Sequence, residues 1–411
     1  MFEWLPWLFL AALACFGMGW LVARVDIKQL LSESRALPQS YFKGLNFLMA
    51  EQPDKAIEAF IEVTKQQPEA VELQFALGSL FRKRGEVDRA IRIHQSLSER
   101  ADLPAEQRTA ALLDLALDFQ KAGLLEHAER ILCDLAAKGA GSSKQQLQTS
   151  TLLLEIYVQE RDWQKAIEVA GRIKVADGSR THFDKEIANY YCESALQAHQ
   201  KGDAEKAQEF LSAALAANEK CVRANLLKCE WLAADGSHKE AINVWRKIEQ
   251  QNPAYLGLVA DQMLVSFESI GDAELGLKEL SDLQKKHPAL DLFNAIFHAT
   301  LDSKGAIAAY ELVKEDLRQN PTLVGLDRML QAELLAAPDD KKADIKVLKD
   351  LVHTHSSRLA VYLCANCGFK ARQFYWQCPA CAGWETFPPR RTAEYDSSER
   401  HLAKLQTEGI T

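Results

Sequence analysis

Residues 84–93 read RGEVDRAIRI, and similar phrases recur at regular intervals along the chain. Each phrase combines a tight turn with the start of an apolar helix face. Gly44 and Gly78 are 34 residues apart, as are Ala56 and Ala90. A period of this length is typical of stacked helical hairpins. Further copies are EQPDKAIEAF (51–60), AGLLEHAERI (122–131), ERDWQKAIEV (160–169), KGDAEKAQEF (201–210), DGSHKEAINV (235–244) and IGDAELGLKE (270–279).

The repeated phrase predicts tetratricopeptide repeats, in which each unit is a pair of antiparallel helices. A small residue recurs where the two helices of a unit press together, and a Gly or Asp precedes each second helix, as the turn and the N-cap require. One unit cannot bury its apolar face alone, so the units stack into a superhelix. We predict an all-α fold with about nine units over residues 37–355, the last two (289–320 and 322–355) being degenerate. The small residues are Ala56, Ala90, Ala128, Ala166, Ala207 and Ala241.

The segment from Trp4 to Ala23 contains no charged residue. As a helix rising 1.5 Å per residue it spans about 30 Å, the thickness of the apolar core of a bilayer. Tryptophans lie near both ends, where their rings favour the membrane interface. We predict a transmembrane anchor at residues 1–24 and a juxtamembrane linker at residues 25–36. A cleaved signal peptide, a lipoprotein signal at Cys15 and a buried core helix are the alternatives, but a signal needs a basic residue before the apolar run.

Basic residues indicate the orientation of this anchor. Arg24, Lys28 and Arg35 follow the apolar segment, and no Lys or Arg precedes it. The positive-inside rule places the side rich in basic residues in the cytoplasm. We therefore expect a single-pass membrane protein whose soluble part lies in the cytoplasm, where cysteine thiols stay reduced.

Composition and motifs argue against two classes of function. The 411 residues carry a formal net charge of −8, whereas nucleic-acid binding needs a basic surface. The ten histidines are dispersed, and no HExxH, GxSxG or GxGxxG motif occurs. We expect neither an enzyme nor a protein that binds nucleic acid.

The stretch YLCANCGFKARQFYWQCPACAGW (362–384) holds four of the nine cysteines as two CxxC pairs. The spacing Cys364-x2-Cys367-x10-Cys378-x2-Cys381 places two tight turns about one short hairpin apart, and each turn aims two sulfurs at one point. Four thiolates in a reducing compartment predict a closed tetrahedral site for one metal ion, either iron or zinc. A redox dithiol would need only one CxxC pair, beside a βαβ unit.

The frame CxxCG with CPxCxG is similar to rubredoxin and is also common in zinc ribbons, so both metals stay open. We predict a rubredoxin-like metal ribbon over residues 358–391 and a disordered tail over residues 392–411. Gly368 stands where a left-handed backbone is often needed. Aromatic residues crowd the cysteines, and a segment of about 30 residues cannot bury them all alone. We therefore expect the ribbon to dock against the last helical repeats.

The first helices of such repeats line a concave face that usually binds a peptide or a folded protein. We predict that this array binds protein partners. The repeat geometry places on that face Phe75, Ser79, Arg82 and Lys83 of the second unit and Thr151, Glu155, Val158 and Gln159 of the fourth. For any single residue of this set, a solvated helix face is the alternative.

The combination of anchor, repeats and ribbon resembles the lipopolysaccharide assembly protein B family of Gram-negative bacteria. The phrases LGSLFRKRGEVDRAIRIHQSL (77–97) and YWQCPACAGW (375–384) carry much of the resemblance. It extends from the anchor to about Arg391 and does not include the tail from Thr392 to Thr411. The four clustered cysteines match the metal ligands of the family.

The resemblance implies a function that the residues alone do not give. Members of the family lie in the bacterial inner membrane and face the cytoplasm. They limit lipopolysaccharide supply by helping a membrane-bound FtsH-type AAA protease degrade the LpxC deacetylase, which commits precursor to lipid A. The resemblance also implies coordination with export, so lipopolysaccharide export proteins are further candidate partners.

Two other functions remain compatible with the residues. The chain could be a generic membrane-tethered scaffold for an envelope-assembly or export complex. It could also carry electrons through a rubredoxin iron, although such a role does not explain a helical array of this size.

Overall fold

The computed structural model describes residues 43–389, except for residues 45, 48, 51, 67–69, 178–182, 320 and 360. The predicted anchor, linker and tail lie outside the described residues. Among those that are described, no helix has both the length and the apolar character to cross a membrane. The chain divides into two compact units, one ending at Glu160 and the other beginning at Arg161.

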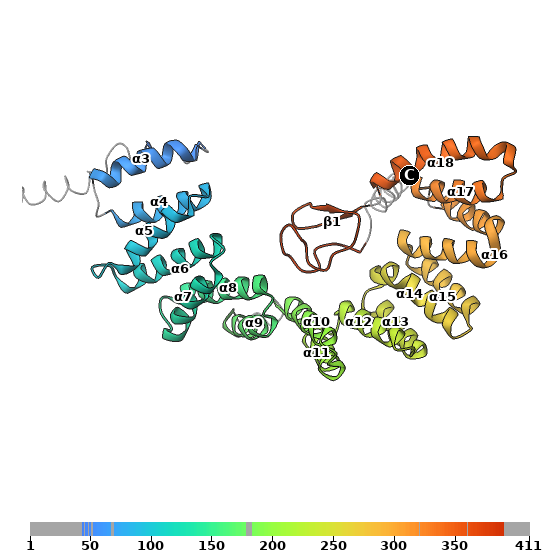
Figure 1. The fold of residues 1–411 in the computed structure, drawn as a ribbon, viewed down its shortest axis with the longest axis horizontal. Coiled ribbons are helices and arrows are strands. Elements are labelled where there is room, and N and C mark those ends of the chain that lie inside the picture. The colour runs from blue at the N-terminus through green and yellow to red at the C-terminus, as the bar shows by residue number, and fades with distance from the viewer. Residues whose placement is uncertain are drawn as a thin grey trace, which may run out of the picture. The chain divides into compact units, whose positions relative to one another are not determined.

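The first unit is a stack of helical hairpins (Figure 1). Helix α4 packs on α5 and α6 packs on α7, while α4 contacts α6 and α6 contacts α8. The first helices of successive hairpins therefore lie side by side, as in a tetratricopeptide array. The helices are α3 (Pro53–Gln66), α4 (Val71–Arg84), α5 (Val87–Glu99), α6 (Ala105–Lys121), α7 (Leu125–Lys138) and α8 (Ser143–Glu160).

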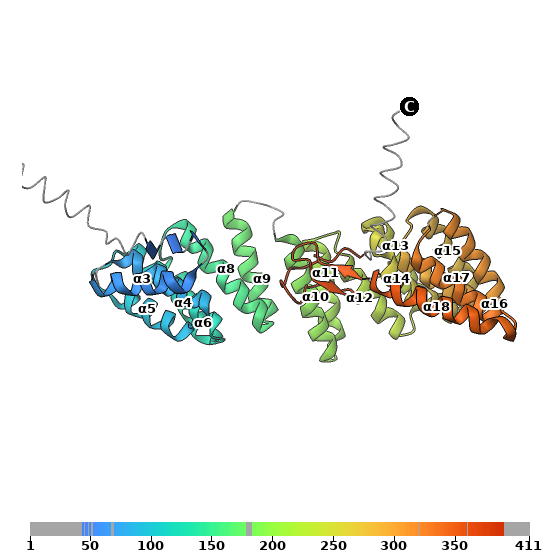
Figure 2. The ribbon, with the colours of Figure 1, turned by 90° about the horizontal axis from the view of Figure 1, so that it is seen from above.

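The second unit continues the same pattern and ends in a short two-stranded sheet (Figures 1 and 2). Helices α10, α12, α14 and α16 contact one another in turn. Helix α16 is kinked at Gly305, whose φ of 86° and ψ of 175° are not helical. The elements are α9 (Trp163–Asp177), α10 (Asp184–Gln200), α11 (Ala204–Ala217), α12 (Val222–Ala234), α13 (His238–Gln251), η1 (Pro253–Tyr255), α14 (Leu256–Ser269), α15 (Ala273–Lys286), α16 (Leu290–Gln319), α17 (Leu323–Ala336), α18 (Asp339–Leu359), β1 (Tyr362–Leu363) and β2 (Lys370–Ala371).

The repeated phrase forms hairpins for the reasons expected from its residues. The six small residues of the phrase, from Ala56 to Ala241, are fully buried between helices. At the turn between α4 and α5, Gly85 has a φ of 87°, and the next residue donates its N–H to Phe81 O at 2.9 Å. This left-handed glycine closes the last helical turn of α4. The mostly helical, tetratricopeptide-like fold is therefore confirmed.

A close approach of α4 and α5 at Gly78 gives a stability prediction. A Cβ atom on Gly78 would lie 2.4 Å from Nε2 of His94, which is fully buried. We expect Gly78→Ala to lower the free energy of unfolding by roughly 1–3 kcal/mol, because the buried ring has no free space. Gly171→Ala is the matched control, since nothing lies within 4 Å of a Cβ there. We expect that control to be neutral or stabilising by up to about 1 kcal/mol.

Hydrogen exchange of α4 and α9 amides measures the two glycine variants separately. Equal protection changes in the two helices, or no change for Gly78→Ala, would show that the predicted steric conflict does not exist.

Candidate metal centre and ribbon docking site

The ribbon, which we define as residues 362–389, consists of two similar turns. Strand β1 pairs antiparallel with β2, and a second bridge joins Gln377 to Trp384. In the first turn the Gly368 N–H donates to Cys364 O at 2.9 Å, and in the second the Ala382 N–H donates to Cys378 O at 2.8 Å. Both donors have left-handed backbone, with φ of 74° at Gly368 and 55° at Ala382. The left-handed backbone predicted for Gly368 is thus confirmed.

These two turns bring the four predicted ligand sulfurs together. All four Sγ atoms lie within 4.8 Å of one another. The Sγ atoms of Cys364 and Cys381 are 3.8 Å apart, and those of Cys367 and Cys378 are 3.7 Å apart. A tetrahedral ion with metal–sulfur bonds of about 2.3 Å requires sulfur–sulfur distances of roughly 3.8 Å. The donor set therefore fits one closed tetrathiolate site, which suits zinc and iron alike.

The thiols do not ionise equally without a cation. Desolvation opposes ionisation of Cys364, but its contact with the Thr386 hydroxyl and backbone N–H groups lower its pKa to about 6. The Gly383 N–H and then the Asn366 amide lower the pKa of Cys381. The Phe369 N–H also lowers the pKa of Cys367. Desolvation and the neighbouring sulfurs outweigh this effect and raise the pKa of Cys367 to about 12. A bound divalent cation would remove this conflict by allowing every sulfur to be a thiolate.

The ribbon docks on the second unit through aromatic rings. Trp384 is only 6% exposed, and its ring makes edge contacts with the rings of Trp163 in α9 and Tyr190 in α10, at centroid distances of 6.1 and 6.0 Å. Trp376 stacks on Tyr255 of η1 at 5.3 Å with an interplanar angle of 3°. Such contacts add to the free energy gained by removing large rings from water.

A polar network joins the ribbon to α10 and α12. The Asn189 side chain donates to Glu385 Oε1 at 2.8 Å and accepts from Arg223 at 3.3 Å. Arg223 also donates to Glu193 at 2.6 Å, and its guanidinium carbon lies 5.3 Å from the centroid of the Trp384 ring. A buried charge is tolerated only when it is paired in this way. The network fixes the orientation of the ribbon as well as its position.

The position of the ribbon differs from the sequence-based expectation. Its partners lie on α9, α10, α12, η1 and the start of α16, where Asp291 accepts from the Tyr362 hydroxyl at 2.5 Å. The expected contact with the last repeats occurs only at Asp291, whereas the other described contacts lie on earlier repeats that the chain reaches by folding back (Figure 1). The repeat spacing contained no signal for this choice, because Trp163, Tyr190, Arg223 and Tyr255 occupy ordinary helix or turn positions.

Glu385 gives a prediction about pH. Burial raises the pKa of Glu385, and the hydrogen bond from Asn189 only partly offsets this effect. The docked state therefore binds a proton more readily than the undocked state, and the stability of docking should fall as pH rises through that pKa. Glu385→Gln keeps an oxygen for Asn189 and removes the charge. We expect the variant to dock at least as firmly at neutral pH and to lose this pH dependence.

The measurement is hydrogen exchange of α10 amides between about pH 5 and 8, corrected for intrinsic exchange. The control is Glu205→Gln, because Glu205 is exposed on α11. If Glu385→Gln docks less firmly than the wild type at every pH, burial of the Glu385 charge does not oppose docking.

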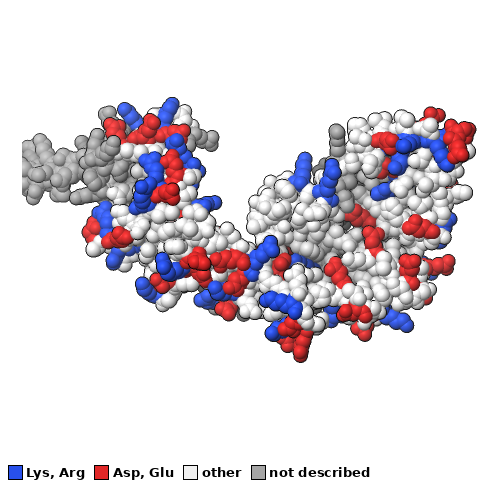
Figure 3. All heavy atoms as spheres, viewed as in Figure 1, with Lys and Arg blue, Asp and Glu red and all other residues white. Residues whose placement is uncertain are grey.

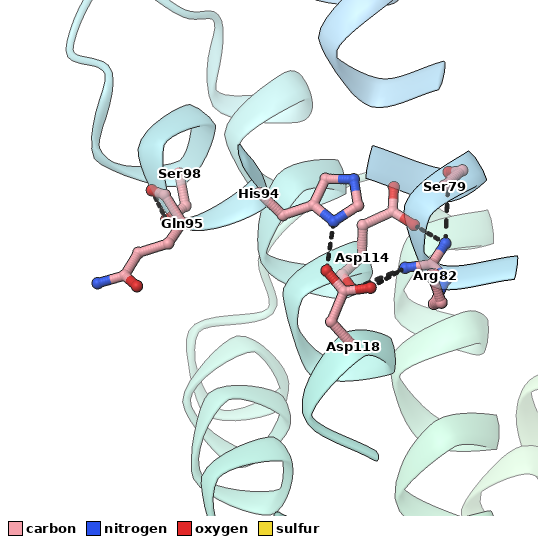
Figure 4. A network of polar contacts seen from close by, with 7 residues as sticks. All are labelled: Ser79, Arg82, His94, Gln95, Ser98, Asp114 and Asp118. Atoms are coloured by element: carbon pink, nitrogen blue, oxygen red, sulfur yellow. Dashed lines mark hydrogen bonds and ion pairs between the residues drawn. The ribbon is translucent and has the colours of Figure 1, made fainter. Parts of the chain in front are cut away.

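The candidate partner-binding residues on α4 lie partly within the fold. Arg82 forms ion pairs with Asp114 at 2.7 Å and with Asp118 at 2.8 Å, and it contacts Ser79 (Figure 4). Asp118 is fully buried and also contacts His94 Nδ1 at 2.5 Å. This network joins α4, α5 and α6, so Arg82 has a structural role that its spacing did not reveal.

The other candidates differ in exposure. Phe75 is half-buried against the core beside His94, whereas Lys83 is exposed. On α8, the hydroxyl of Thr151 donates to its own helix, Glu155 accepts from Gln120 at 3.4 Å and Val158 is half-buried. Gln159, the last of the set, is exposed. Partner binding by these residues stays a prediction.

Comparisons with known proteins match both the ribbon and the helical repeats. A model described as a rubredoxin metal binding domain matches residues 362–389, and one described as a tetratricopeptide repeat matches residues 43–102. Lipopolysaccharide assembly protein B of Escherichia coli (strain K12) is 31% identical over 389 residues, which cover 93% of this chain and 98% of that protein. The chain belongs to the lipopolysaccharide assembly protein B family.

Lipopolysaccharide assembly protein B of Haemophilus influenzae is 28% identical over 404 residues. The matched residues cover 95% of this chain and 99% of that protein. Among solved structures, MamA is 20% identical, and the match covers 43% of this chain and 95% of the MamA chain. Its TM-score of 0.32 is too low to support a conclusion about the fold. The family predicted from the sequence is confirmed. The relatives are named as assembly proteins, which is consistent with a non-enzymatic role.

Proposed function

We propose that this chain is a membrane-anchored cytoplasmic adaptor of the bacterial inner membrane. It promotes degradation of the LpxC deacetylase by an FtsH-type protease, and it coordinates lipopolysaccharide assembly with export proteins as further partners. The observation that carries the proposal is the match, over 93% of this chain, to a protein named lipopolysaccharide assembly protein B.

The physical arrangement supports an adaptor. Stacked hairpins offer a long surface for a protein partner, and the docked ribbon contacts helices of several successive repeats. An anchor in the same membrane as the protease would raise the effective concentration of the array near it. Exposed side chains such as Lys83 and Gln159 are free to contact a partner without loss of packing.

Deletion of the gene tests the proposal. Without the adaptor, LpxC should accumulate and lipopolysaccharide should rise, and the wild-type gene should restore both. Steady LpxC turnover in the deletion strain would refute the proposed function.

Affinity purification from membranes distinguishes the adaptor from a generic scaffold. The full chain and a chain ending before residue 362 should be compared after mild cross-linking. Recovery of the FtsH-type protease with the full chain supports the adaptor. Recovery of envelope-assembly proteins alone favours a scaffold for an assembly or export complex.

A topology reporter fused after Thr411 tests the proposed location. Activity in the cytoplasm is expected from the basic residues that follow the anchor. Activity of the reporter on the other side of the membrane would remove the basis for contact with a cytoplasmic deacetylase.

A further inference from the structure

Two cysteines outside the ribbon form a buried pair in the second unit. The Sγ atoms of Cys192 in α10 and Cys221 at the start of α12 lie 3.9 Å apart, although the residues are 29 positions apart in the sequence. Both side chains are fully buried, in a small core whose other buried members are alanine and leucine residues. Both are free thiols. Stacking of α10 against α12 therefore places two nucleophilic sulfurs in contact.

The surroundings of the two sulfurs differ. Cys221 is the N-cap residue of α12, where the positive end of the helix dipole favours a thiolate. The hydrogen bond from the Cys192 thiol lowers the pKa of Cys221, and the Ala224 N–H acts in the same direction against desolvation. The same hydrogen bond, together with burial, raises the pKa of Cys192. Cys221 is thus suited to be the attacking thiolate, and Cys192 is the neighbouring thiol that donates to it.

A third cysteine of α12 shows what burial does alone. Cys229 is also fully buried, and the structure gives it no contact with another sulfur among the described residues. Burial raises the pKa of Cys229, which keeps this thiol protonated and unreactive. The difference between Cys221 and Cys229 therefore comes from the position at the helix end and from the second sulfur.

We propose that Cys192 and Cys221 are a redox-active dithiol, which hydrogen peroxide converts to a disulfide between α10 and α12. The Cys221 thiolate attacks one peroxide oxygen, the O–O bond breaks, hydroxide leaves and a sulfenic acid forms on Cys221. Cys192 then attacks that sulfur, and the sulfenic hydroxyl leaves with the Cys192 proton as water. Two thiols and one peroxide thus give one disulfide and two waters. A dithiol reductant reverses the reaction by thiol–disulfide exchange.

A small neutral oxidant suits this site. Side chains of both charges are mixed over the second unit on the face shown in Figure 3, so the surface there does not select an oxidant of one charge. Hydrogen peroxide is uncharged and little larger than water, and it can enter when the helices open transiently. In the cytoplasm proposed for this part of the chain, such a disulfide is a transient, redox-sensing modification.

The pair lies beside the attachment of the ribbon. The charges of Glu385 in the ribbon and Arg223 in α12 both act on the Cys221 thiol, the first raising and the second lowering its pKa. Oxidation would covalently link α10 and α12, the helices whose Asn189 and Arg223 form the polar network with Glu385. The inference goes beyond the proposed function, because an adaptor needs no redox chemistry.

Peptide mapping of the full chain tests the proposal. The metal-loaded protein in detergent is treated with hydrogen peroxide until the exposed thiol of Cys133 is fully oxidised. Free thiols are then alkylated, and the digest is analysed by mass spectrometry without reduction. We expect peptides that contain Cys192 and Cys221 to be linked in most chains, and the link to disappear after treatment with dithiothreitol. This measurement uses the wild type and does not depend on the folding of a variant.

Serine variants test the assigned roles. Cys192→Ser removes the second thiol, so the sulfenic acid should persist on Cys221, and dimedone should label Cys221 about tenfold more than Cys229. Cys221→Ser should leave Cys192 largely unlabelled. Cys229→Ser is the matched control and should give the wild-type yield of the disulfide. Circular dichroism checks that the variants keep their helical content.

Three results would overturn the proposal. One is a wild type in which Cys192 and Cys221 are still alkylated as free thiols when Cys133 is fully oxidised. Another is a disulfide that joins either residue to a different cysteine. The third is equal dimedone labelling of Cys221 and Cys229 in Cys192→Ser, which would show that the pair has no special reactivity.

Discussion

Replacing Cys364 and Cys367 by serine should remove the metal and release the ribbon from the helices. We expect metal content to fall from about one ion per chain to almost none, because two of four thiolate ligands are lost. Within the ribbon itself, little else stabilises the fold. Its strands are two residues long, and its small core consists of Tyr362, Cys364, Cys378 and Phe387.

Metal analysis of the purified chain, together with tryptophan fluorescence, measures both effects. Trp376 and Trp384 should move into water, and their emission should shift to longer wavelength. Cys133→Ser is the control, because Cys133 is a free, exposed cysteine in the first unit. Full metal content in the double variant, or metal loss with unchanged fluorescence, would show that the site does not hold the ribbon together.

Truncating Trp384 should release the ribbon without removing its metal. The ring is 6% exposed and lies against Trp163, Tyr190 and the Arg223 guanidinium. Loss of a buried Trp side chain typically costs about 3–5 kcal/mol. We expect Trp384→Ala to reduce the free energy of docking by roughly that amount, so that the ribbon is undocked for much of the time.

Hydrogen exchange and metal analysis distinguish this variant from the loss of the ligands. Amides of α10 and α12 should lose protection, while metal content stays near one ion per chain, because Trp384 is not a ligand. Phe369→Ala is the matched control, since Phe369 is a ribbon aromatic that is 39% exposed. Unchanged protection in Trp384→Ala, or equal loss in both variants, would contradict the docking model.

These two variants separate two contributions to the same structure. A bound metal ion would hold the two turns of the ribbon closed, whereas the aromatic and polar contacts attach the ribbon to α9, α10, α12, η1 and α16. Under the proposed function, the rate of LpxC turnover in a strain that carries each variant shows which of the two steps the function needs. If both variants lose LpxC turnover, docking is required; if only the cysteine variant loses it, a folded ribbon is sufficient.

Local patterns explain why much of the fold could be predicted. The period of 34 residues, the alanines at close approaches and the turn glycines act within a single hairpin, and the hairpins form as expected. The clustering of the four cysteine sulfurs could also be predicted, because a CxxC turn brings two sulfurs together whatever surrounds it.

Contacts between distant residues could not be predicted in the same way. Arg82 looked like a surface residue of α4, yet Asp114 and Asp118 of the next hairpin pair with it. The hydrogen bond between Asn189 and Glu385 joins residues that are 196 positions apart. No local spacing encodes such a pair.

Residues close together in the sequence specify the repeated hairpins and the cluster of four cysteines, and the resemblance they carry identifies the family of this protein. The docking position of the ribbon and the neutralisation of charges inside the array depend instead on the tertiary structure. The physical reason is that helix pairing and metal ligation follow from residues a few positions apart. Docking instead depends on which surfaces meet once the hairpins have stacked.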